Sequence, residues 1–216
     1  MNMNYENVLK NLENNNIQAF YAENCKAAVE IVKTLIKEGD TVTMGGSMSV
    51  SQSGVRDLIA GGKYNFLDRT REGITPEEID ELYRQTFFAD AYFCSSNAVT
   101  ENGELYNVDG NSNRVAAILY GPKSVIMIVG KNKIVKNIDE AINRVKTIAA
   151  PKNTQRLGKE TYCRINGKCV SLNNDDTYMC DGCNGANRIC RNYVICGPQR
   201  DKHRIKVILV NENLGY

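Results

Sequence analysis

Six of the eight cysteines of this 216-residue sequence fall within 34 residues of its C-terminal part. Two of them, Cys180 and Cys183, form a CxxC pair. Two sulfurs at this spacing can bind one metal ion from a single turn, and outlying cysteines can complete a tetrahedral set. The pattern predicts a metal site that uses about four of six candidate ligands. These candidates are Cys163, Cys169, Cys180, Cys183, Cys190 and Cys196.

The chemistry of this cysteine cluster is left open by the sequence. Ligation by thiolates alone suits both a zinc ion and an iron–sulfur cluster, and a set of unligated thiols is the alternative to both. A thioredoxin-like redox role is disfavoured, because there the CxxC motif opens a helix after a strand near the start of the fold. Here the motif lies in a late, polar stretch.

A loop rich in glycine and serine, GGSMSVSQSG at Gly45–Gly54, follows a strand expected at Thr41–Met44. Backbone N–H groups in such a strand-to-helix turn can approach an anion, and serine hydroxyls can add donors. The motif is neither a GxGxxG fingerprint nor a Walker loop, so a tight turn without a ligand is the alternative. The candidate ligand-binding residues here are Gly45, Gly46, Ser47 and Ser49.

A second candidate site lies in the polar stretch Thr100–Gly121. It begins with Thr-Glu-Asn-Gly, which looks like the Ser-Glu-Asn-Gly motif of CoA transferases, where the glutamate attacks an acyl-CoA. By that resemblance Glu101 is a candidate catalytic nucleophile, and Asn102 and Gly103 are candidate ligand-binding residues beside it. The alternative is a hairpin turn, for which Asn-Gly between two strands is a strong signal.

Four further polar residues of this stretch could bind an anion. An arginine near a helix start can hold a carboxylate or phosphate with two hydrogen bonds, which suits lactate, a sugar phosphate or CoA. Alternatively, these residues only form a turn and a helix cap. The four candidates are Asp109, Asn111, Asn113 and Arg114. The single histidine, His203, lies in a polar basic run, which excludes a Ser/His/Asp triad and a histidine-based metal site.

Strands and helices alternate through the first 150 residues, a pattern that predicts βαβ units and a doubly wound parallel sheet. The expected helices are Asn4–Asn15, Ala27–Lys37, Val50–Ala60, Thr75–Phe87, one beginning near Asn113, and Ile138–Ala149, which Pro151 would close. The expected strands are Ile17–Tyr21, Thr41–Met44, Tyr64–Leu67, Ala91–Ser95, Ser124–Gly130, Lys133–Val135 and Arg204–Val210. We therefore expect an α/β domain at residues 1–150 and a cysteine-rich tail at 151–216, whose last strand packs back on the domain.

Composition and charge restrict the class of protein. The apolar runs are short, so no transmembrane segment is expected. The N-terminus lacks the basic and apolar regions of a secretion signal, which favours a cytoplasmic location. Residues 151–216 carry 11 Lys/Arg against 6 Asp/Glu, but no basic run is interleaved with aromatic residues, so nucleic acid is a poor candidate partner.

Several of these segments together resemble the lactate-utilisation (LUD-domain) family. The matching segments read GGSMS, then FFADAYFCSSNAVTENGELYNVDGNSNRVAAILYGPKSVIMIVGKNKIV, then CDGCNGANRIC, and finally RIKVILVNENLGY. The resemblance implies a Rossmann-like three-layer sandwich, similar to ribose-5-phosphate isomerase, glucosamine-6-phosphate deaminase and CoA transferases. It also implies an association with bacterial oxidation of lactate to pyruvate, in which relatives act beside iron–sulfur subunits.

Three functions follow as hypotheses. The first is a ligand-binding subunit or accessory factor of lactate and organic-acid utilisation, with a cysteine-bound metal. The second is an enzyme that resembles CoA transferases or sugar-phosphate isomerases and uses Glu101. The third is a non-catalytic interaction module stabilised by metal. The expected partners are an anionic small molecule (CoA or a phosphorylated ligand included), iron–sulfur oxidoreductase subunits and a second copy of the chain.

Overall fold

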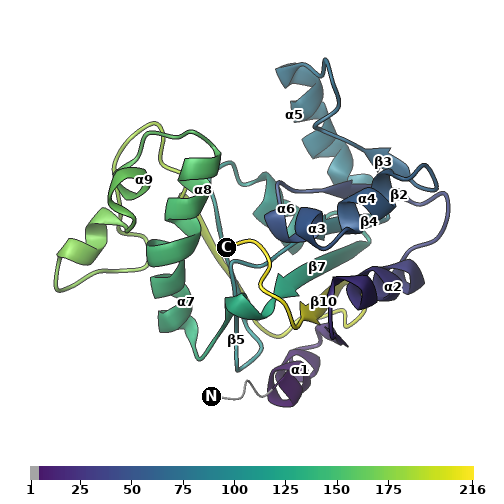
Figure 1. Ribbon diagram of the computed structural model, residues 1–216, viewed down its shortest axis with the longest axis horizontal. Helices are drawn as coiled ribbons and strands as arrows, with labels where there is room; N and C mark the ends of the chain where they lie inside the picture. The colour runs from purple at the N-terminus through teal and green to yellow at the C-terminus, as the bar shows by residue number, and fades with distance from the viewer. Residues whose placement is uncertain (1–4) are drawn as a thin grey trace.

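A six-stranded parallel sheet forms the centre of the molecule in the computed structural model, which describes residues 5–216 (Figure 1). The strands follow the order β1-β10-β7-β4-β2-β3, and each neighbouring pair is parallel. Their bounds are β1 Gln18–Ala22, β2 Thr41–Met44, β3 Asn65–Leu67, β4 Ala91–Cys94, β7 Ser124–Gly130 and β10 Ile205–Val210. The prediction of an α/β fold with a mostly parallel sheet is confirmed.

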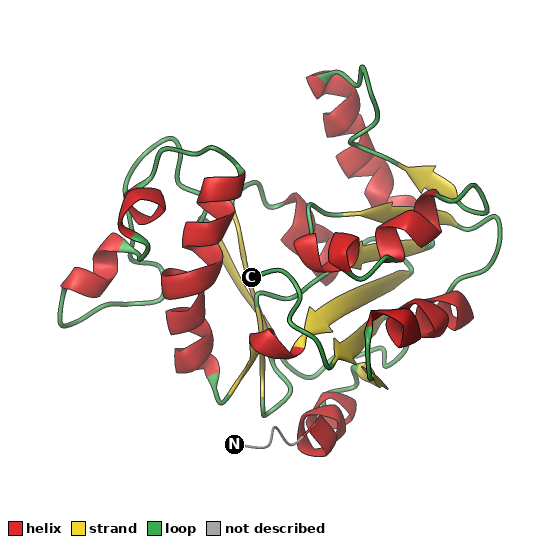
Figure 2. Ribbon diagram, viewed as in Figure 1, coloured by secondary structure: helices red, strands yellow, loops and turns green. Residues whose placement is uncertain are grey.

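Helices cover both faces of this sheet (Figure 2). Successive side chains of a strand point to opposite faces, so β7 contributes Ile126 and Ile128 to one core and Val125, Met127 and Val129 to the other. The first core is closed by α2, α3 and α4, and the second by α1 and α6 together with a smaller sheet. The helix bounds are α1 Tyr5–Asn14, α2 Cys25–Leu35, α3 Met48–Gln52, α4 Val55–Ala60 and α6 Asn113–Leu119.

The smaller sheet has four strands in the order β8-β5-β6-β9. Leu105 and Cys196 point from it into the core of the main sheet, whereas Ala98 and Tyr106 pack on the other side against a long helical run. The strand bounds are β5 Ala98–Thr100, β6 Leu105–Asp109, β8 Ile134–Val135 and β9 Asn192–Cys196. The smaller sheet therefore joins the main sheet to this helical run.

The helical run contradicts the expectation that Pro151 ends a helix at Ala149. It consists of α7 (Ile138–Arg144), the π-helical segment η3 (Val145–Ala149) and α8 (Ala150–Arg156). A proline in a regular α-helix clashes with the carbonyl four residues earlier and lacks an N–H. The π-helical turn just before Pro151 relieves both problems, and Pro151 then occupies the first turn of α8, where a missing N–H costs little.

The prediction of one continuous helix at Val50–Ala60 is also wrong. It is divided into α3 and α4, because Gly54 adopts a left-handed conformation with φ +80° between them. Of the helix expected at Asn4–Asn15, Asn4 lies outside the described residues, and α1 begins at Tyr5. The helix expected at Thr75–Phe87 is observed as α5 (Pro76–Gln85), which Thr75 caps, followed by a short 3-10 turn, η1 (Thr86–Phe88).

The last strand does more than pack against the edge of the domain. β10 lies between β1 and β7 and pairs with both along its length, so it holds β1 in the sheet (Figure 1). The cysteine-rich segment between α8 and β10 contains α9 (Tyr162–Asn166), the 3-10 turn η4 (Val170–Asn173) and β9. The proposed boundary at residue 150 falls inside the continuous helical run of η3 and α8.

No helix within residues 5–216 is both long enough and apolar enough to cross a lipid bilayer.

Candidate functional site

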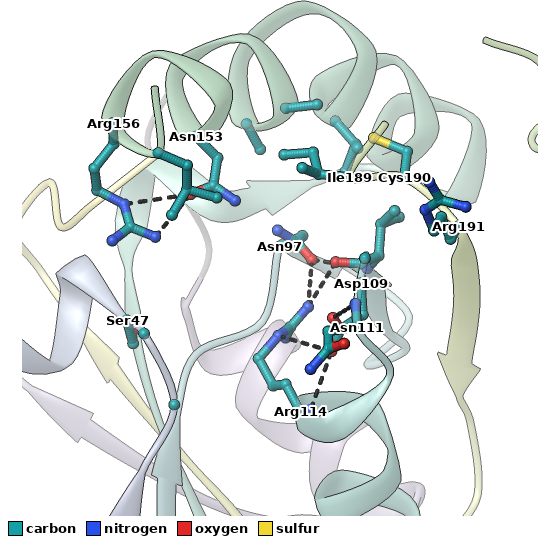
Figure 3. Close-up of a pocket in the computed structure, with 18 of the residues that line it drawn as sticks. Ser47, Asn97, Asp109, Asn111, Arg114, Asn153, Arg156, Ile189, Cys190 and Arg191 are labelled. Atoms are coloured by element: carbon teal, nitrogen blue, oxygen red, sulfur yellow. Dashed lines mark hydrogen bonds and ion pairs between the residues drawn. The ribbon is translucent and has the colours of Figure 1, made fainter. Parts of the chain in front are cut away.

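A cavity of about 480 Å³ opens at the carboxyl edge of the main sheet. Three loops that follow parallel strands meet there: Gly45–Met48 after β2, Ser95–Asn97 after β4, and the 3-10 turn η2 (Lys131–Lys133) after β7. The opposite wall is formed by η3, α8 and the loop before β9, as Figure 3 shows. This is the position at which open α/β sheets bind ligands.

The cavity is strongly cationic. Among the described residues that line it, seven are lysines or arginines and one, Asp109, has an acidic side chain. The cationic residues are Arg69, Arg114, Lys133, Arg156, Lys159, Arg188 and Arg191. A site with this balance favours an anionic ligand by electrostatic attraction.

Two of these guanidinium groups converge on the glycine-rich turn. A Cβ atom placed on Gly46 would lie 2.5 Å from a terminal nitrogen of Arg69 and 3.8 Å from one of Arg156. The two arginines come from distant parts of the chain, the loop after β3 and the helix α8. Gly46 itself forms no hydrogen bond through its N–H within the described residues. The turn therefore offers a backbone donor beside two cations.

The partners of Arg69 and Arg156 are neutral. Arg69 donates to the Tyr83 hydroxyl at 2.8 Å, and Arg156 donates to Asn153 and to the Tyr216 hydroxyl, the latter at 2.6 Å. Within residues 5–216, neither forms an ion pair with a carboxylate. Their charges are therefore available to an incoming anion.

Lys133 lines the cavity and is 5% exposed. Its Nζ donates to Ser49 Oγ at 2.9 Å and to Ser95 Oγ at 3.1 Å. Burial lowers the pKa of Lys133 to about 7, and the charges of Arg144 and Arg114 act in the same direction, whereas Cys94 opposes them. A buried amine of this kind, with no carboxylate partner among the described residues, is typical of functional sites.

Arg114 holds the cavity wall together. Its two terminal nitrogens donate to the carbonyls of Ser95 and Val108 and to the amide oxygens of Asn97 and Asn107, at 2.6–3.1 Å. Figure 3 shows the bond to Asn97. These four bonds use the hydrogens of both terminal nitrogens. Arg114 therefore lines the cavity, as expected, but its fork binds the protein.

Asp109 is similarly occupied by the protein. Its carboxylate accepts hydrogen bonds from the N–H groups of Asn111, Arg114 and Val115 at 3.0–3.1 Å, and lies 3.9 Å from the Arg114 side chain. It thus stabilises the first turn of α6. Asn111 and Asn113 also line the cavity.

The residues of the glycine-rich loop have different environments. Gly45, Gly46 and Ser47 line the cavity, and Ser47 Oγ caps α3 by accepting from the Val50 N–H at 3.3 Å. Ser49 is buried, and its hydroxyl donates to the carbonyl of Leu214. Ser49 therefore contacts a ligand only through Lys133, which it orients.

Glu101, Asn102 and Gly103 lie elsewhere, in the turn between β5 and β6. Glu101 and Asn102 are exposed, and their carbonyls accept hydrogen bonds from Asn11 of α1 and from Asn15 just after it. Gly103 has φ +83°, and a Cβ there would lie 2.6 Å from the backbone of Asn11. This turn is not part of the cationic cavity. Its geometry is that of the hairpin alternative, and the nucleophilic role of Glu101 stays a prediction.

Four of the six tail cysteines line a second, much smaller cavity of about 30 Å³. They are Cys163, Cys169, Cys183 and Cys190. Burial raises the pKa of the Cys190 thiol to about 12, and charges on Cys163 and Cys169 raise it in the same direction. Within residues 5–216, no three His, Cys, Asp or Glu side chains lie close enough together to hold a metal ion.

The other two cysteines are placed differently. Cys180 is exposed and does not line this cavity. Cys196 lies on β9 and is buried in the core of the main sheet. The structure therefore separates the six candidates into one group of four and two outliers.

Sequence reasoning did not identify Arg69, Lys133 and Arg156 as site residues. Lys133 had a usable signal, because a charged residue soon after a buried parallel strand lies at the ligand-binding edge. Arg156 follows the proline that was expected to end the helix. Arg69 lies in a loop with several other charged residues.

Comparisons with known proteins agree with this fold. The model of one family, the LUD domain, matches residues 5–210. The crystal structure of a DUF162 family protein from Deinococcus radiodurans is similar with a TM-score of 0.50 and 14% identity, over 96% of this chain and 99% of that one. At this identity the similarity concerns the fold alone.

Weaker similarities extend to two other crystal structures from Chaetomium thermophilum. eIF2B beta has a TM-score of 0.36 and 16% identity over 52% of this chain and 43% of its own. eIF2B delta has a TM-score of 0.33 and 21% identity over 55% and 49%. Among curated proteins, the comparison found no match.

Proposed function

Since the chain belongs to the LUD-domain family, we propose that it binds a small organic anion in the cationic cavity, as a ligand-binding subunit or accessory factor of lactate and organic-acid utilisation. The observation that carries the proposal is the convergence of Arg69 and Arg156 on Gly46 without a carboxylate partner. Two guanidinium groups beside a backbone N–H can bind a carboxylate or a phosphate.

The arrangement is selective for anions for an electrostatic reason. Unpaired cations close together repel each other, so an anion that enters relieves this repulsion and gains charge-assisted hydrogen bonds. A neutral ligand of the same shape gains neither. Binding should therefore weaken as the salt concentration rises.

The test is calorimetric titration of the full chain with lactate, pyruvate, inorganic phosphate, ribose 5-phosphate and CoA. Replacement of either arginine by glutamine (Arg69→Gln or Arg156→Gln) should weaken binding of the accepted anion roughly tenfold or more, because each removes a charged hydrogen bond. The matched control is Arg71→Gln, since Arg71 belongs to the same loop but pairs with Glu78 outside the cavity. Undiminished binding by both cavity variants would reject the proposal.

A single substitution, Glu101→Gln, distinguishes the enzymatic alternative from anion binding. Glu101 is remote from the cationic cavity, so Glu101→Gln should leave anion binding unchanged. Trapping of a thioester on Glu101 after incubation with an acyl-CoA, with loss of the product in Glu101→Gln, would instead favour the CoA-transferase-like function.

We also propose that the sandwich is of the ribose-5-phosphate isomerase and CoA-transferase type. The parallel sheet, the helices on both faces and the ligand cavity at the carboxyl edge support it. An experimental structure superposed on members of that fold would test the assignment.

The tail carries a second part of the proposal: Cys163, Cys169, Cys183 and Cys190 bind one metal centre. Their side chains fit this role by chemistry, because four soft donors line one cavity. Asp181 lines it too, and its carboxylate accepts a hydrogen bond from the Tyr178 N–H. Binding requires the loop at residues 169–183 to draw closer, since the thiols do not yet lie within reach of one ion. A bound zinc ion would hold this loop in place, and an iron–sulfur cluster would add electron transfer.

Metal and labile-sulfide analysis of protein purified without oxygen distinguishes the cases. Replacing any of the four cysteines by serine should abolish metal binding, whereas Cys180→Ser and Cys196→Ser are the controls and should retain it. The alternative is metal binding centred on the CxxC pair. That result would appear as metal retained after replacement of Cys163, Cys169 or Cys190 but lost in Cys180→Ser. Protein without any metal would exclude both.

A further inference from the structure

Lys133 is in an environment that an ordinary buried lysine does not have. Most buried ammonium groups pair with a carboxylate, because an unpaired buried charge is costly. Lys133 instead contacts two serine hydroxyls, and the positive charges of Arg144 and Arg114 act on it. The site therefore favours the neutral amine, which is the form that acts as a nucleophile.

The hydrogen bonds around Lys133 also orient this amine. The Ser49 hydroxyl donates its hydrogen to the carbonyl of Leu214 at 3.1 Å, and the Ser95 hydroxyl donates to the carbonyl of Ser96 at 3.3 Å. Both serine oxygens can then only accept from Lys133. A neutral amine has two hydrogens, and these two bonds use both.

The remaining position on the nitrogen is its lone pair. No protein donor occupies that position within the described residues. Lys133 and Ser95 both line the cationic cavity, together with Arg69 and Arg156. An anion held by the two arginines would thus share one cavity with an amine whose lone pair is not used by the protein.

We propose that Lys133 forms an imine with the carbonyl carbon of a small carbonyl compound that carries a carboxylate or phosphate group. The nitrogen attacks the carbonyl carbon, a C–N bond forms, and the C=O π pair moves to oxygen. Proton transfer from nitrogen to oxygen gives a carbinolamine, and loss of one water molecule gives the imine. No oxidant or reductant is needed. The inference rests on the proposed function, because it requires the anion in the same cavity.

The amine is suited to this reaction near neutral pH. Its pKa of about 7 leaves a large part of it unprotonated, whereas an ordinary lysine, with a pKa of about 10.4, is almost fully charged there. Labelling at Lys133 should therefore rise between about pH 6 and pH 8 and then level off, while labelling of surface lysines continues to rise.

The test is reductive trapping on the full chain. The protein is incubated with pyruvate or with ribose 5-phosphate in the presence of cyanoborohydride, which reduces an imine to a stable secondary amine, and peptide mass mapping locates the adduct. We expect one adduct per chain, at Lys133, and its loss in Lys133→Arg. Lys131→Arg is the matched control, since Lys131 belongs to the same turn as Lys133 but does not line the cavity. The compound that labels identifies whether a carboxylate or a phosphate is accepted.

Binding measured in parallel separates the two proposals. Lactate has the carboxylate of pyruvate but no carbonyl, so it should bind, compete with pyruvate and leave no adduct. Anion binding without an adduct at Lys133 in wild type would overturn the imine and keep the proposed function. Absence of both binding and adduct would overturn both. An adduct spread over surface lysines, with none enriched at Lys133, also overturns the inference, and it does so without relying on the folding of any variant.

Discussion

At the scale of single residues, the two adjacent glycines of the β2–α3 turn have different roles. A Cβ on Gly45 would lie 2.6 Å from the hydroxyl of Tyr92, a buried ring that cannot move aside. A Cβ on Gly46 would lie 2.5 Å from the tip of Arg69, which can rotate away. The first glycine is therefore needed for packing, and the second for the position of a cation.

This difference predicts opposite effects of two alanine substitutions. Gly45→Ala should lower the free energy of unfolding by about 1–3 kcal/mol, the usual cost of overpacking. Gly46→Ala should change that free energy little but weaken anion binding, because Arg69 is displaced. Urea unfolding and calorimetric titration of both variants check the pair. Undiminished anion binding by Gly46→Ala would show that Arg69 does not bind the anion beside this turn.

Lys133 gives a second prediction, on the pH dependence of stability. An unfolded lysine keeps its proton up to about pH 10.4, whereas the folded state releases it at about pH 7. Between these values the unfolded chain holds the extra proton, so this group makes stability rise with pH, and its penalty is greatest below pH 7. Relative to Lys133→Met, wild type should gain up to about 1.4 kcal/mol per pH unit in this window.

Urea unfolding of wild type and Lys133→Met at several pH values between 6 and 10 measures this gain. Lys131→Met is the control, since Lys131 belongs to the same turn but is only partly buried. Parallel curves for wild type and Lys133→Met would mean that Lys133 stays charged in the folded protein. That result would also weaken the case for imine formation.

At the scale of elements, short polar segments set the positions of the cavity walls. Helix α6 begins where the Asp109 carboxylate accepts from three backbone N–H groups, and Arg114 on its first turn ties β6 to the loop after β4. The wall is thus a hydrogen-bonded network that joins Asp109, Arg114 and the amide oxygens of Asn97 and Asn107. Removal of one side chain from this network leaves the groups that it bound without hydrogen-bond partners.

Asp109→Ala should therefore lower the free energy of unfolding by about 1–2 kcal/mol, the range for loss of a strong helix cap. Asp139→Ala is the matched control, because Asp139 is an exposed acid in the first turn of α7, and its loss should cost less. Thermal or urea unfolding measures both. Equal effects of the two substitutions would show that the cap adds nothing beyond its charge.

The elements also show what the sequence could and could not predict. The strands of the main sheet and the amphipathic helices were predicted well, because burial on one or two faces leaves a clear period of apolar residues. Strands β5, β6 and β9 of the smaller sheet were not among the expected strands. Pro151 was misread, because a π-helical turn that admits a proline has no recognisable sequence signal. Because the helix was expected to end before Pro151, Arg156 on α8 was not predicted as a site residue. Eight residues of these two polar stretches were predicted to bind a ligand, and all but Ser49 line one cavity: Gly45, Gly46, Ser47, Asp109, Asn111, Asn113 and Arg114.

At the scale of the whole molecule, strands of the expected tail, residues 151–216, pair with strands of the expected domain, residues 1–150. The main sheet takes β10 from beyond the cysteine-rich segment, and β9 completes the smaller sheet. Sequence patterns identified the apolar strand Arg204–Val210 but not its place, because strand order in a parallel sheet is set by tertiary packing. An interior position also explains why β10 is apolar on both faces.

Residues 1–150 expressed alone should therefore not fold. Without β10, strand β1 has no neighbour in the sheet, and apolar side chains of β7 lose their cover. Circular dichroism and the cooperativity of urea unfolding, compared with residues 1–216, test this expectation. A cooperative transition in the fragment would show that the first 150 residues are an independent domain.

The central place of β10 also has a consequence for how the protein is made. A ribosome releases β1 early and β10 only after nearly all of the described chain, so β1 has no strand to pair with for most of synthesis. Until then the apolar edge of β7 stays open, and open strand edges are sites of aggregation. Native folding of this sheet thus waits for β10, and nascent chains that pause before β10 expose this open edge.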